Sequence, residues 1–396
     1  PRRRALAIDE ASAGNDHPRG AMILCNLAQL LQATNRLSEA EPLMARVVEI
    51  FEISYGNEHP NVATALNNLA LLLKATNRLS EAEPLMSRAL AIDEASYGED
   101  HSAVARDLNN LAQLLQATNR LGEAEPLMRR ALAIDEASYG NVHPKVAIRL
   151  NNLALLLQAT NRLSEAEPLM RRALAIDEAS YGNDHPMVAR HLNNLAALLQ
   201  DINRPAEAEP LMRRALAIAE ASYGSDHPNV ASGLSNLAGL LQATNRLSEA
   251  EPLMARVVEI FEISYGNEHP NVATALNNLA QLMKVTNRLS EAEPLMARVV
   301  EIFEISYGKD HPNVATALNN LAQLLQATNR LSEAEPLMRR NVAILMAFLR
   351  QGYQHPNLEA GVNNYGNLLH QMGHSEAEIK AKLQSLLPEP NVPPAQ

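Results

Sequence analysis

The chain has 396 residues, of which 46% are hydrophobic and only 3% are aromatic. Such an apolar fraction can bury a large core, whereas few aromatic residues and only 16 glycines disfavour an aromatic-cored enzyme or a turn-rich β protein. The net charge of −11 disfavours nucleic acid as a partner, because binding a polyanion requires a surplus of basic residues. The single cysteine, Cys25, excludes an internal disulfide framework and a cysteine-based zinc site.

The chain shows neither an apolar run long enough to cross a bilayer nor a recognisable signal peptide. We therefore expect a soluble protein of a reducing compartment, which favours a cytoplasmic location. The sequence starts at Pro1 without a methionine, and residues 1–13 match only the second half of the repeat described next. We expect from this start that the chain is part of a longer array.

A 42-residue period runs through almost the whole chain. The dipeptide Asn-Arg recurs at this spacing from Asn35 to Asn329, and so do nine histidines, the last after a longer step. These histidines are His17, His59, His101, His143, His185, His227, His269, His311 and His355. A period this regular is the signature of a repeat architecture.

The first half of each repeat predicts a helix. In the repeat that starts at His59, this helix should begin at Pro60, because proline suits the first helical position. Apolar residues then recur at helical spacing from Val62 to Leu73. The helix should end near Asn77, since asparagine tolerates the left-handed conformation that closes helices.

The second half predicts another helix of similar length. We expect it to begin at Ser80, with Glu83 completing a capping box and Pro84 in the first turn. Gly98 marks its end. The connections are so short that successive helices should be antiparallel neighbours.

Neither helix can bury its apolar stripe alone, so stacked repeats should form an all-α solenoid with one continuous core. We expect this solenoid over residues 1–387, as nine helix pairs after a leading half-repeat, and a Pro-rich disordered tail over residues 388–396. The first helices should start near Pro18, Pro60, Ser102, Pro144, Pro186, Pro228, Pro270, Pro312 and Pro356. The polar final helix, with Lys380 and Lys382, fits a cap on the stack.

The packing residues of the repeat resemble those of the tetratricopeptide repeat, whose ordinary length is about 34 residues. They are Leu69, Ala70, Leu79, Ala82, Met86 and Ala89. The longer unit, with its Tyr-Gly-x-x-His-Pro joint and its Leu-Asn-Asn-Leu-Ala segment, resembles the arrays of kinesin light chains and of many bacterial proteins. The resemblance implies a right-handed superhelix whose concave wall, formed by the first helices, binds peptide segments of partner proteins. A heptad segment for pairing with a motor heavy chain is missing from the sequence, so motor attachment is not implied.

Two neighbouring asparagines recur in the first helix. The second is present in all nine repeats, which favours a structural hydrogen bond. The first is replaced by Cys25 and Ser235 in two repeats, and the resemblance places it towards the groove, where an amide can bond a peptide backbone. The predicted peptide-binding asparagines are Asn67, Asn109, Asn151, Asn193, Asn277 and Asn319.

Two further columns of the first helix vary from repeat to repeat and are predicted to tune the choice of partner. One contains Arg106 and Arg190, and the other contains Gln113, Gln281 and Gln323. Neutral drift on a solvated surface is the alternative explanation. A clamp for a terminal carboxylate is disfavoured, because neither arginine has an obvious lysine beside it.

Several residue types that suggest chemistry have structural explanations. The joint histidines lie one repeat apart, too far to share a metal ion, and fit helix starts and joint packing. His191, His370 and His374 are expected on the surface. We predict no metal, cofactor or catalytic site, since no nucleophile elbow, phosphate loop or paired carboxylates are recognisable.

The recurrent charged residues also have structural explanations. Glu81 and Glu83 are assigned to capping and to the helix dipole. The pair Arg129-Arg130 is assigned to a solvated face with acidic neighbours.

The function favoured by the sequence is a non-catalytic scaffold that binds proteins or peptide segments in a concave groove. Residues 30–70 and 240–280 are identical, which fits an extended repetitive surface better than a pocket tailored to a small molecule. Two alternatives remain: a regulatory or sensor arm of a larger signalling protein, and a structural spacer that self-associates by stacking.

Overall fold

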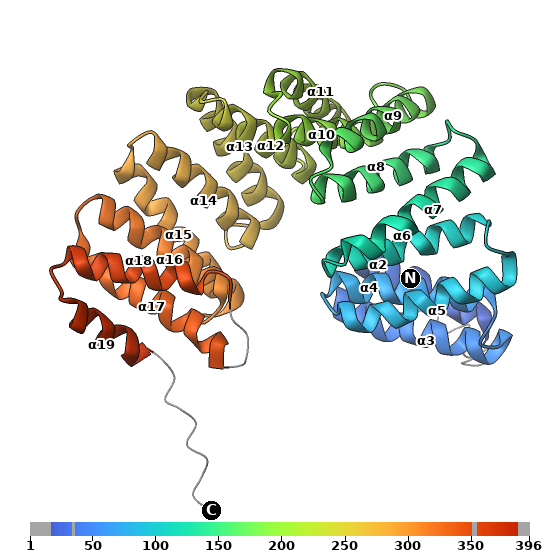
Figure 1. Ribbon diagram of the computed structural model, residues 1–396, viewed down its shortest axis with the longest axis horizontal. Coiled ribbons are helices and arrows are strands. Elements are labelled where there is room, and N and C mark those ends of the chain that lie inside the picture. The colour runs from blue at the N-terminus through green and yellow to red at the C-terminus, as the bar shows by residue number, and fades with distance from the viewer. Residues whose placement is uncertain (1–16, 34–35, 351–354, 387–396) are drawn as a thin grey trace, which may run out of the picture. The chain divides into compact units, whose positions relative to one another are not determined.

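The computed structural model describes residues 17–33, 36–350 and 355–386, which contain eighteen helices and no strand (Figure 1). The first helices of the repeats are α2 (Pro18–Ala33), α4 (Pro60–Ala75), α6 (Ser102–Ala117), α8 (Pro144–Ala159), α10 (Pro186–Asp201), α12 (Pro228–Ala243), α14 (Pro270–Val285), α16 (Pro312–Ala327) and α18 (Leu358–Gln371). The second helices are α3 (Leu37–Tyr55), α5 (Leu79–Tyr97), α7 (Leu121–Tyr139), α9 (Leu163–Tyr181), α11 (Pro205–Tyr223), α13 (Leu247–Tyr265), α15 (Leu289–Tyr307), α17 (Leu331–Arg350) and α19 (Glu376–Leu386). The predicted leading half-repeat and tail lie outside the described residues.

The chain divides into two compact units, Pro1–Arg204 and Pro205–Gln396, called unit 1 and unit 2 below. Unit 1 contains α2 to α10, and unit 2 contains α11 to α19. Within each unit every helix packs against the next along the chain. In unit 1 the first helices of adjacent repeats also touch, α4 with α6 and α8 with α10. Each unit is therefore an all-α stack of consecutive helix pairs, as predicted for a solenoid.

The joint histidines cap the first helices, as their position predicts. The Nδ1 atom of His59 accepts the backbone N–H of Asn61 at 3.1 Å, at the start of α4. The ring of Tyr55, the last residue of α3, stacks on His59 with 4.6 Å between ring centroids. The same cap recurs at His101 and at the later joints that the structure describes.

The first helices end in the left-handed conformation that the Asn-Arg dipeptide predicts. The residues concerned have φ between 58° and 61°. They are Asn77, Asn119, Asn161, Asn203, Asn245, Asn287 and Asn329. The second helices end at a glycine with positive φ, for example Gly98 at 83°.

We expect Asn119→Ala to lower the free energy of unfolding by about 1 kcal/mol, because the left-handed conformation costs most residues roughly 1–2 kcal/mol. Asn119→Gly should be close to neutral, since glycine adopts this conformation without strain. Urea denaturation of the three proteins measures the difference. Equal stability of the alanine and glycine variants would contradict the explanation that Asn recurs here because it tolerates the left-handed conformation.

The capping box predicted at Ser80 is wrong. Helix α5 begins one residue earlier, at Leu79, after Arg78, which makes no side-chain cap bond. The guanidinium of Arg78 instead pairs with Glu81, with 2.6 Å between Nε and Oε1. Ser80 is exposed inside the helix, and Pro84 lies in the second turn rather than the first. The ion pair with Glu81 takes the place of the expected serine cap.

The arginine that precedes each second helix also binds the preceding repeat. Arg120 contacts Glu123 in its own repeat, and its Nη1 lies 2.7 Å from Oε1 of Glu83 in the preceding repeat. Assigning Glu83 to capping alone was therefore wrong. The inter-repeat pairs within the two units are Arg78–Glu41, Arg120–Glu83, Arg162–Glu125, Arg204–Glu167, Arg246–Glu209, Arg288–Glu251 and Arg330–Glu293. Because these groups are exposed to solvent, each pair alone contributes little to stability.

A second set of arginines joins adjacent second helices, and Arg129-Arg130 lie, as predicted, on a solvated face with acidic neighbours. The Nη1 of Arg130 lies 2.7 Å from Oε1 of Glu94, and its Nη2 donates to the backbone carbonyl of Glu99 at 3.2 Å. Arg129 pairs with Glu125 within α7. The charged residues of the second helices thus reinforce the stacking of the repeats.

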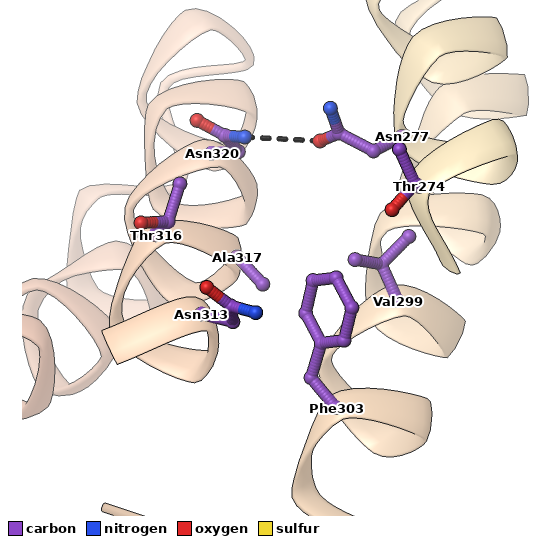
Figure 2. Close-up of a pocket in the computed structure, with 8 residues that line it drawn as sticks. All are labelled: Thr274, Asn277, Val299, Phe303, Asn313, Thr316, Ala317 and Asn320. Carbon is purple, nitrogen blue, oxygen red and sulfur yellow. Dashed lines mark hydrogen bonds between the residues drawn. The ribbon is translucent and has the colours of Figure 1, made fainter. Parts of the chain in front are cut away.

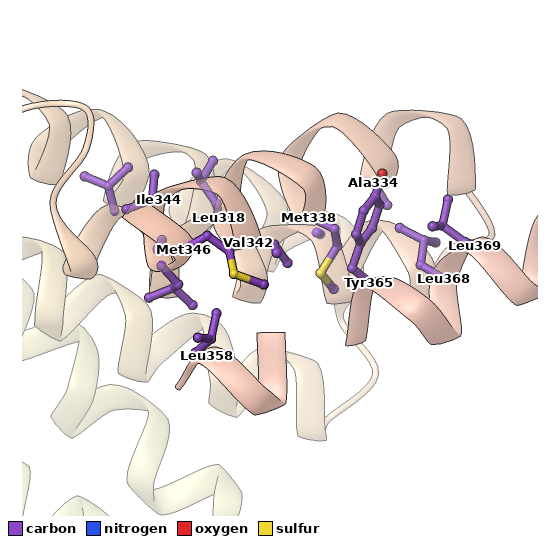
Figure 3. Close-up of a cluster of buried hydrophobic side chains, with 14 of the residues drawn as sticks. Leu318, Ala334, Met338, Val342, Ile344, Met346, Leu358, Tyr365, Leu368 and Leu369 are labelled. Atoms are coloured by element: carbon purple, nitrogen blue, oxygen red, sulfur yellow. The ribbon is translucent and has the colours of Figure 1, made fainter. Parts of the chain in front are cut away.

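The last repeats enclose the most aromatic part of the core. The ring of Tyr365 from α18 is almost fully buried among α16 and α17 residues such as Met338, and Figure 3 shows this cluster. Its hydroxyl donates to Oε1 of Glu335 at 2.7 Å, and burial raises the pKa of the phenol. None of the residues of α19 is buried, in keeping with a helix that closes the stack.

Candidate binding groove

The first helices present one uncovered face, which we call the groove face. On α16 this face carries Asn313, Thr316, Asn320 and Gln323, which recur at helical spacing and are exposed or half-buried. Two hollows open on this face in unit 2, one on each side of α16.

The first hollow lies between α14 and α16 and has a volume of about 240 Å³. We call it the Phe303 hollow, because Phe303 and Val299 of α15 form its floor (Figure 2). The remaining lining residues are Thr274, Asn277, Asn313, Thr316, Ala317 and Asn320. The lining combines an apolar floor with a rim of uncharged polar groups.

The opposing sizes of two residues keep this hollow open. Phe303 occurs in α15, and the residue that faces it from the next first helix is the small Ala317.

The second hollow lies between α16 and α18, has a volume of about 360 Å³ and is called the amide cleft. It is lined by Gln323, Gln326, Asn364, Asn367, His370 and Gln371.

The two asparagine columns bond to each other across neighbouring repeats. Nδ2 of Asn320 donates to Oδ1 of Asn277 at 2.9 Å, across the rim of the Phe303 hollow (Figure 2). The second asparagine of one repeat thus donates to the first asparagine of the preceding repeat. The other pairs are Asn110–Asn67, Asn152–Asn109, Asn194–Asn151 and Asn364–Asn319.

The expected orientation of the two columns is reversed in unit 1. Three of the four side chains predicted to face the groove there, Asn67, Asn109 and Asn151, are only 3–5% exposed, whereas their partners in the second column are half-buried. The physical reason is the ladder itself, because the inner amide accepts a bond from the next first helix and so lies in the helix contact. The predicted Asn193, Asn277 and Asn319 are half-buried, and of these Asn277 lines the Phe303 hollow.

The remaining predicted residues have different environments. Arg106 is engaged with two buried carboxylates, Asp93 at 3.0 Å and Asp107 at 2.8 Å, rather than being available in a groove. Arg190 is exposed, and it has no ion pair or hydrogen bond with any side chain in the described parts of the chain.

The three predicted glutamines are half-buried. Gln113 accepts a hydrogen bond from Lys74 at 3.3 Å, and Gln323 accepts one from Lys284 at 3.4 Å. Of the three, Gln323 lines the amide cleft. Its amide N–H groups are not used by the lysine, so they remain available for a ligand.

Sequence reasoning missed a column of buried carboxylates in unit 1. Asp93, Asp135 and Asp177 are at most 1% exposed and occupy the position that Phe303 holds in α15. A carboxylate inside the apolar stripe of a second helix was the available signal, since buried charges require partners.

The partners come from the next first helix, at the position that Ala317 holds in α16. Asp135 pairs with Arg149 at 2.8 Å, and Asp177 lies 3.1 Å from Nδ1 of His191. His191 is 1% exposed, so its assignment to the surface is wrong. The contact with Asp177, which sequence reasoning did not foresee, accounts for its burial.

The first of these sites brings two carboxyl groups together. Asp107 receives a hydrogen bond from the amide of Asn67, and Arg106 contacts both Asp107 and Asp93. Burial, followed by the neighbouring carboxylate, raises the pKa of Asp93 to about 7. Burial also raises the pKa of Asp107, against the opposing effect of Arg106.

The repeat architecture and its sequence together define an α-solenoid, and comparison with known families identifies its kind. The tetratricopeptide repeat model matches eight overlapping segments of the chain. They are residues 2–53, 36–95, 61–137, 108–179, 145–221, 187–263, 229–304 and 286–347. The chain therefore belongs to the tetratricopeptide repeat family, as the resemblance predicted.

Solved structures of related architecture include proteins of the kinesin-light-chain type. A protein of Podosopora anserina, named as a kinesin light chain with nearly identical repeats, is 25% identical, with a TM-score of 0.46 over 52% of this chain and 99% of that one. BtubC (BKLC) from P. vanneervenii is 23% identical, with a TM-score of 0.49 over 63% of this chain and 94% of that one.

A third structure matches more of the chain. The apo form of the quorum sensor NprR from B. thuringiensis is 12% identical, with a TM-score of 0.61 over 83% of this chain and 88% of that one. At this identity the match supports the fold alone. No curated protein matches the chain.

Tetratricopeptide arrays generally act as protein–protein interaction scaffolds, and their fold is typically non-catalytic. Among the helices that the structure describes, none combines the length and the apolar character needed to cross a bilayer.

Proposed function

We propose that the groove face of unit 2 binds an extended segment of a partner protein, which places one apolar side chain in the Phe303 hollow. The observation that carries the proposal is the hollow itself, with an apolar floor and an uncharged polar rim on an otherwise uncovered helix face. Pockets that combine apolar walls with a few polar groups are the usual form of binding sites.

The rim offers the hydrogen bonds that a peptide unit needs. Nδ2 of Asn320 donates to Oδ1 of Asn277, and this bond uses neither the N–H groups of Asn277 nor the oxygen of Asn320, which can therefore bind a ligand. A free donor and a free acceptor therefore lie side by side, matching the N–H and C=O of a main chain. Of the asparagines predicted for this role, Asn277 is the one that lines the hollow.

The floor supplies the apolar contact. Phe303 and Val299 would cover an aliphatic or aromatic side chain inserted from the groove, and burying such a side chain contributes about 1.5–3 kcal/mol. At the corresponding positions of unit 1, Asp135 faces Arg149 and Asp177 faces His191, and a charged floor favours an apolar side chain less. The first repeats of unit 1 keep the apolar pair as Phe51 and Ala65, but Met22 and Cys25 stand at the rim where unit 2 has Thr274 and Asn277. That rim lacks the asparagine that offers hydrogen bonds to a main chain, so we assign the site to unit 2.

A peptide-display selection against the full chain tests the proposal, with Thr316→Trp as the blocking variant. Thr316 is exposed on the rim, so an indole there should fill the mouth of the hollow without disturbing the core. We expect selected peptides to bind Thr316→Trp at least about tenfold more weakly, the equivalent of 1.4 kcal/mol.

The repeat provides a matched control, because Ile148 holds the equivalent, partly exposed position on α8 in unit 1, beside the Asp135–Arg149 contact. Ile148→Trp should leave the affinity unchanged, and both variants should retain the helical signal and the melting temperature of the parent. Peptides that bind Thr316→Trp as well as the parent would place the site elsewhere and overturn the proposal.

A further inference from the structure

We infer that the groove face of α16 holds two subsites for one ligand, the Phe303 hollow and the amide cleft. The ligand is an uncharged, extended peptide segment with an apolar side chain and, four residues away, a side chain that bears a carboxamide or a hydroxyl. This inference rests on the proposed function, because it takes the Phe303 hollow as the apolar subsite.

The spacing follows from the positions of the lining residues on α16. The residues that line the Phe303 hollow centre near Thr316, and those that line the amide cleft are Gln323 and Gln326. A separation of about eight helical residues corresponds to about 12 Å along the helix. Because the hollows lie on opposite sides of α16, they are also separated across it by about the 8–10 Å between neighbouring helix axes, which gives about 15 Å in all. An extended peptide advances about 3.3 Å per residue, so it spans this distance in about four to five residues. Because side chains alternate in an extended chain, of these two separations only four points both side chains to the same side, towards α16.

The charge of the two hollows selects an uncharged segment. His370 is the only ionisable side chain among the described residues that line either of them. Lys284 of α14 is not among the residues that line the cleft, and its ammonium donates to Oε1 of Gln323 at 3.4 Å. A carboxylate or ammonium of the ligand would therefore lose water without gaining a full opposite charge, which is unfavourable.

The amide cleft has the hydrogen-bonding groups to recognise a carboxamide or a hydroxyl. Nε2 of Gln326 donates to Oε1 of Gln371 at 2.7 Å, which leaves the N–H groups of Gln371 and the oxygen of Gln326 available. Asn367 is exposed on the same cleft, and its amide has no hydrogen bond with any residue that the structure describes. The cleft therefore offers both donors and acceptors, which match the oxygen and the N–H groups of a carboxamide.

Synthetic peptides test the inference. The probes are acetylated and amidated Gly/Ala peptides that contain one leucine and one glutamine, separated by two to seven positions in either order. NMR titration of the full chain gives each Kd. We expect the four-residue separation, in one of the two orders, to bind about tenfold more tightly than separations of three or five, which turn one side chain away from α16. Affinity should change by less than about twofold when salt rises from 50 to 500 mM, because screening acts on charges.

Variants separate the two subsites. Asn367→Ala combined with Gln371→Ala should remove the preference for the four-residue separation and leave the Kd of a leucine-only peptide unchanged. Gln116→Ala, which lies on α6 in unit 1, should alter neither. Thr316→Trp should weaken every leucine peptide.

The possible results distinguish this inference from the proposed function. If Thr316→Trp weakens all peptides but no separation is preferred, the two-subsite inference is overturned and the Phe303 hollow stands. The same holds if the designed peptides fail to bind while displayed peptides remain sensitive to Thr316→Trp. Peptide binding that is insensitive to Thr316→Trp overturns both.

Discussion

Replacing Arg149 by alanine should lower the free energy of unfolding of unit 1 by about 3–5 kcal/mol, because it leaves a buried carboxylate without its partner. The side chain of Arg149 is 11% exposed, and its Nε lies 2.8 Å from Oδ2 of Asp135, which is fully buried. Oδ1 of Asp135 has no hydrogen-bond partner in the described part of the chain, so this carboxylate depends on its contact with Arg149. Urea denaturation, with hydrogen exchange to localise the change to unit 1, measures the loss.

The chain itself supplies the control for this result. Unit 2 fills the equivalent contact with Phe303 and Ala317, so the double variant Asp135→Phe with Arg149→Ala copies a pair that already exists in the same solenoid. Replacing a buried ion pair by well-packed apolar residues is often neutral or stabilising. We therefore expect the double variant to regain most of the stability. If Arg149→Ala costs less than about 1 kcal/mol, the pair does not hold α7 against α8.

The second large effect is a dependence of stability on pH at Asp93 and Asp107. The pKa of Asp93 is raised from 3.8 to about 7, and that of Asp107 is also raised, so the folded state binds these protons more tightly than the unfolded state. The contribution of this site to stability is therefore greatest below about pH 4 and is lost as the pH rises to about 7. The loss is on the order of 4 kcal/mol, since each pKa unit corresponds to about 1.4 kcal/mol.

Asp107→Asn isolates this contribution from the other titrating groups. The asparagine removes the second charge, so Asp93 faces Arg106 without a competing carboxylate. We expect the variant to be more stable than the parent above pH 7 and to match it more closely near pH 4, measured by thermal unfolding across this range. Asp184→Asn, at an exposed position in unit 1, should show the pH dependence of the parent. A variant that is less stable than the parent at every pH would contradict the assignment.

Local signals made the helix boundaries predictable. Pro60 starts a helix through its fixed backbone angle, and Asn77 and Gly98 end helices through their tolerance of positive φ, so each effect depends on the residue alone. The start of the second helix was predicted wrongly, because Ser80 and Glu83 form a good local capping pattern. The arrangement that forms instead relies on Arg78, whose guanidinium also reaches Glu41 in the preceding repeat.

The features of the groove depend on contacts between helices, which a local pattern does not contain. Asn109 is buried because Asn152, in the next repeat, donates to it. Asp177 can be buried inside the stack because its carboxylate contacts His191 of the next first helix. The Phe303 hollow likewise requires the small Ala317 opposite the ring. Comparing equivalent positions of neighbouring repeats reveals all three relationships once the packing is known.

The most direct test of peptide binding at α16 is photo-cross-linking with a displayed peptide that carries a diazirine analogue of leucine at its apolar position. Mass spectrometry of the cross-linked full chain then identifies the residues in contact. The groove-binding account predicts cross-links to Phe303, Val299 or Ala317, and their loss in Thr316→Trp. Cross-links that fall outside the Phe303 hollow, on the outer surfaces of second helices or in unit 1, and persist in Thr316→Trp, would contradict it.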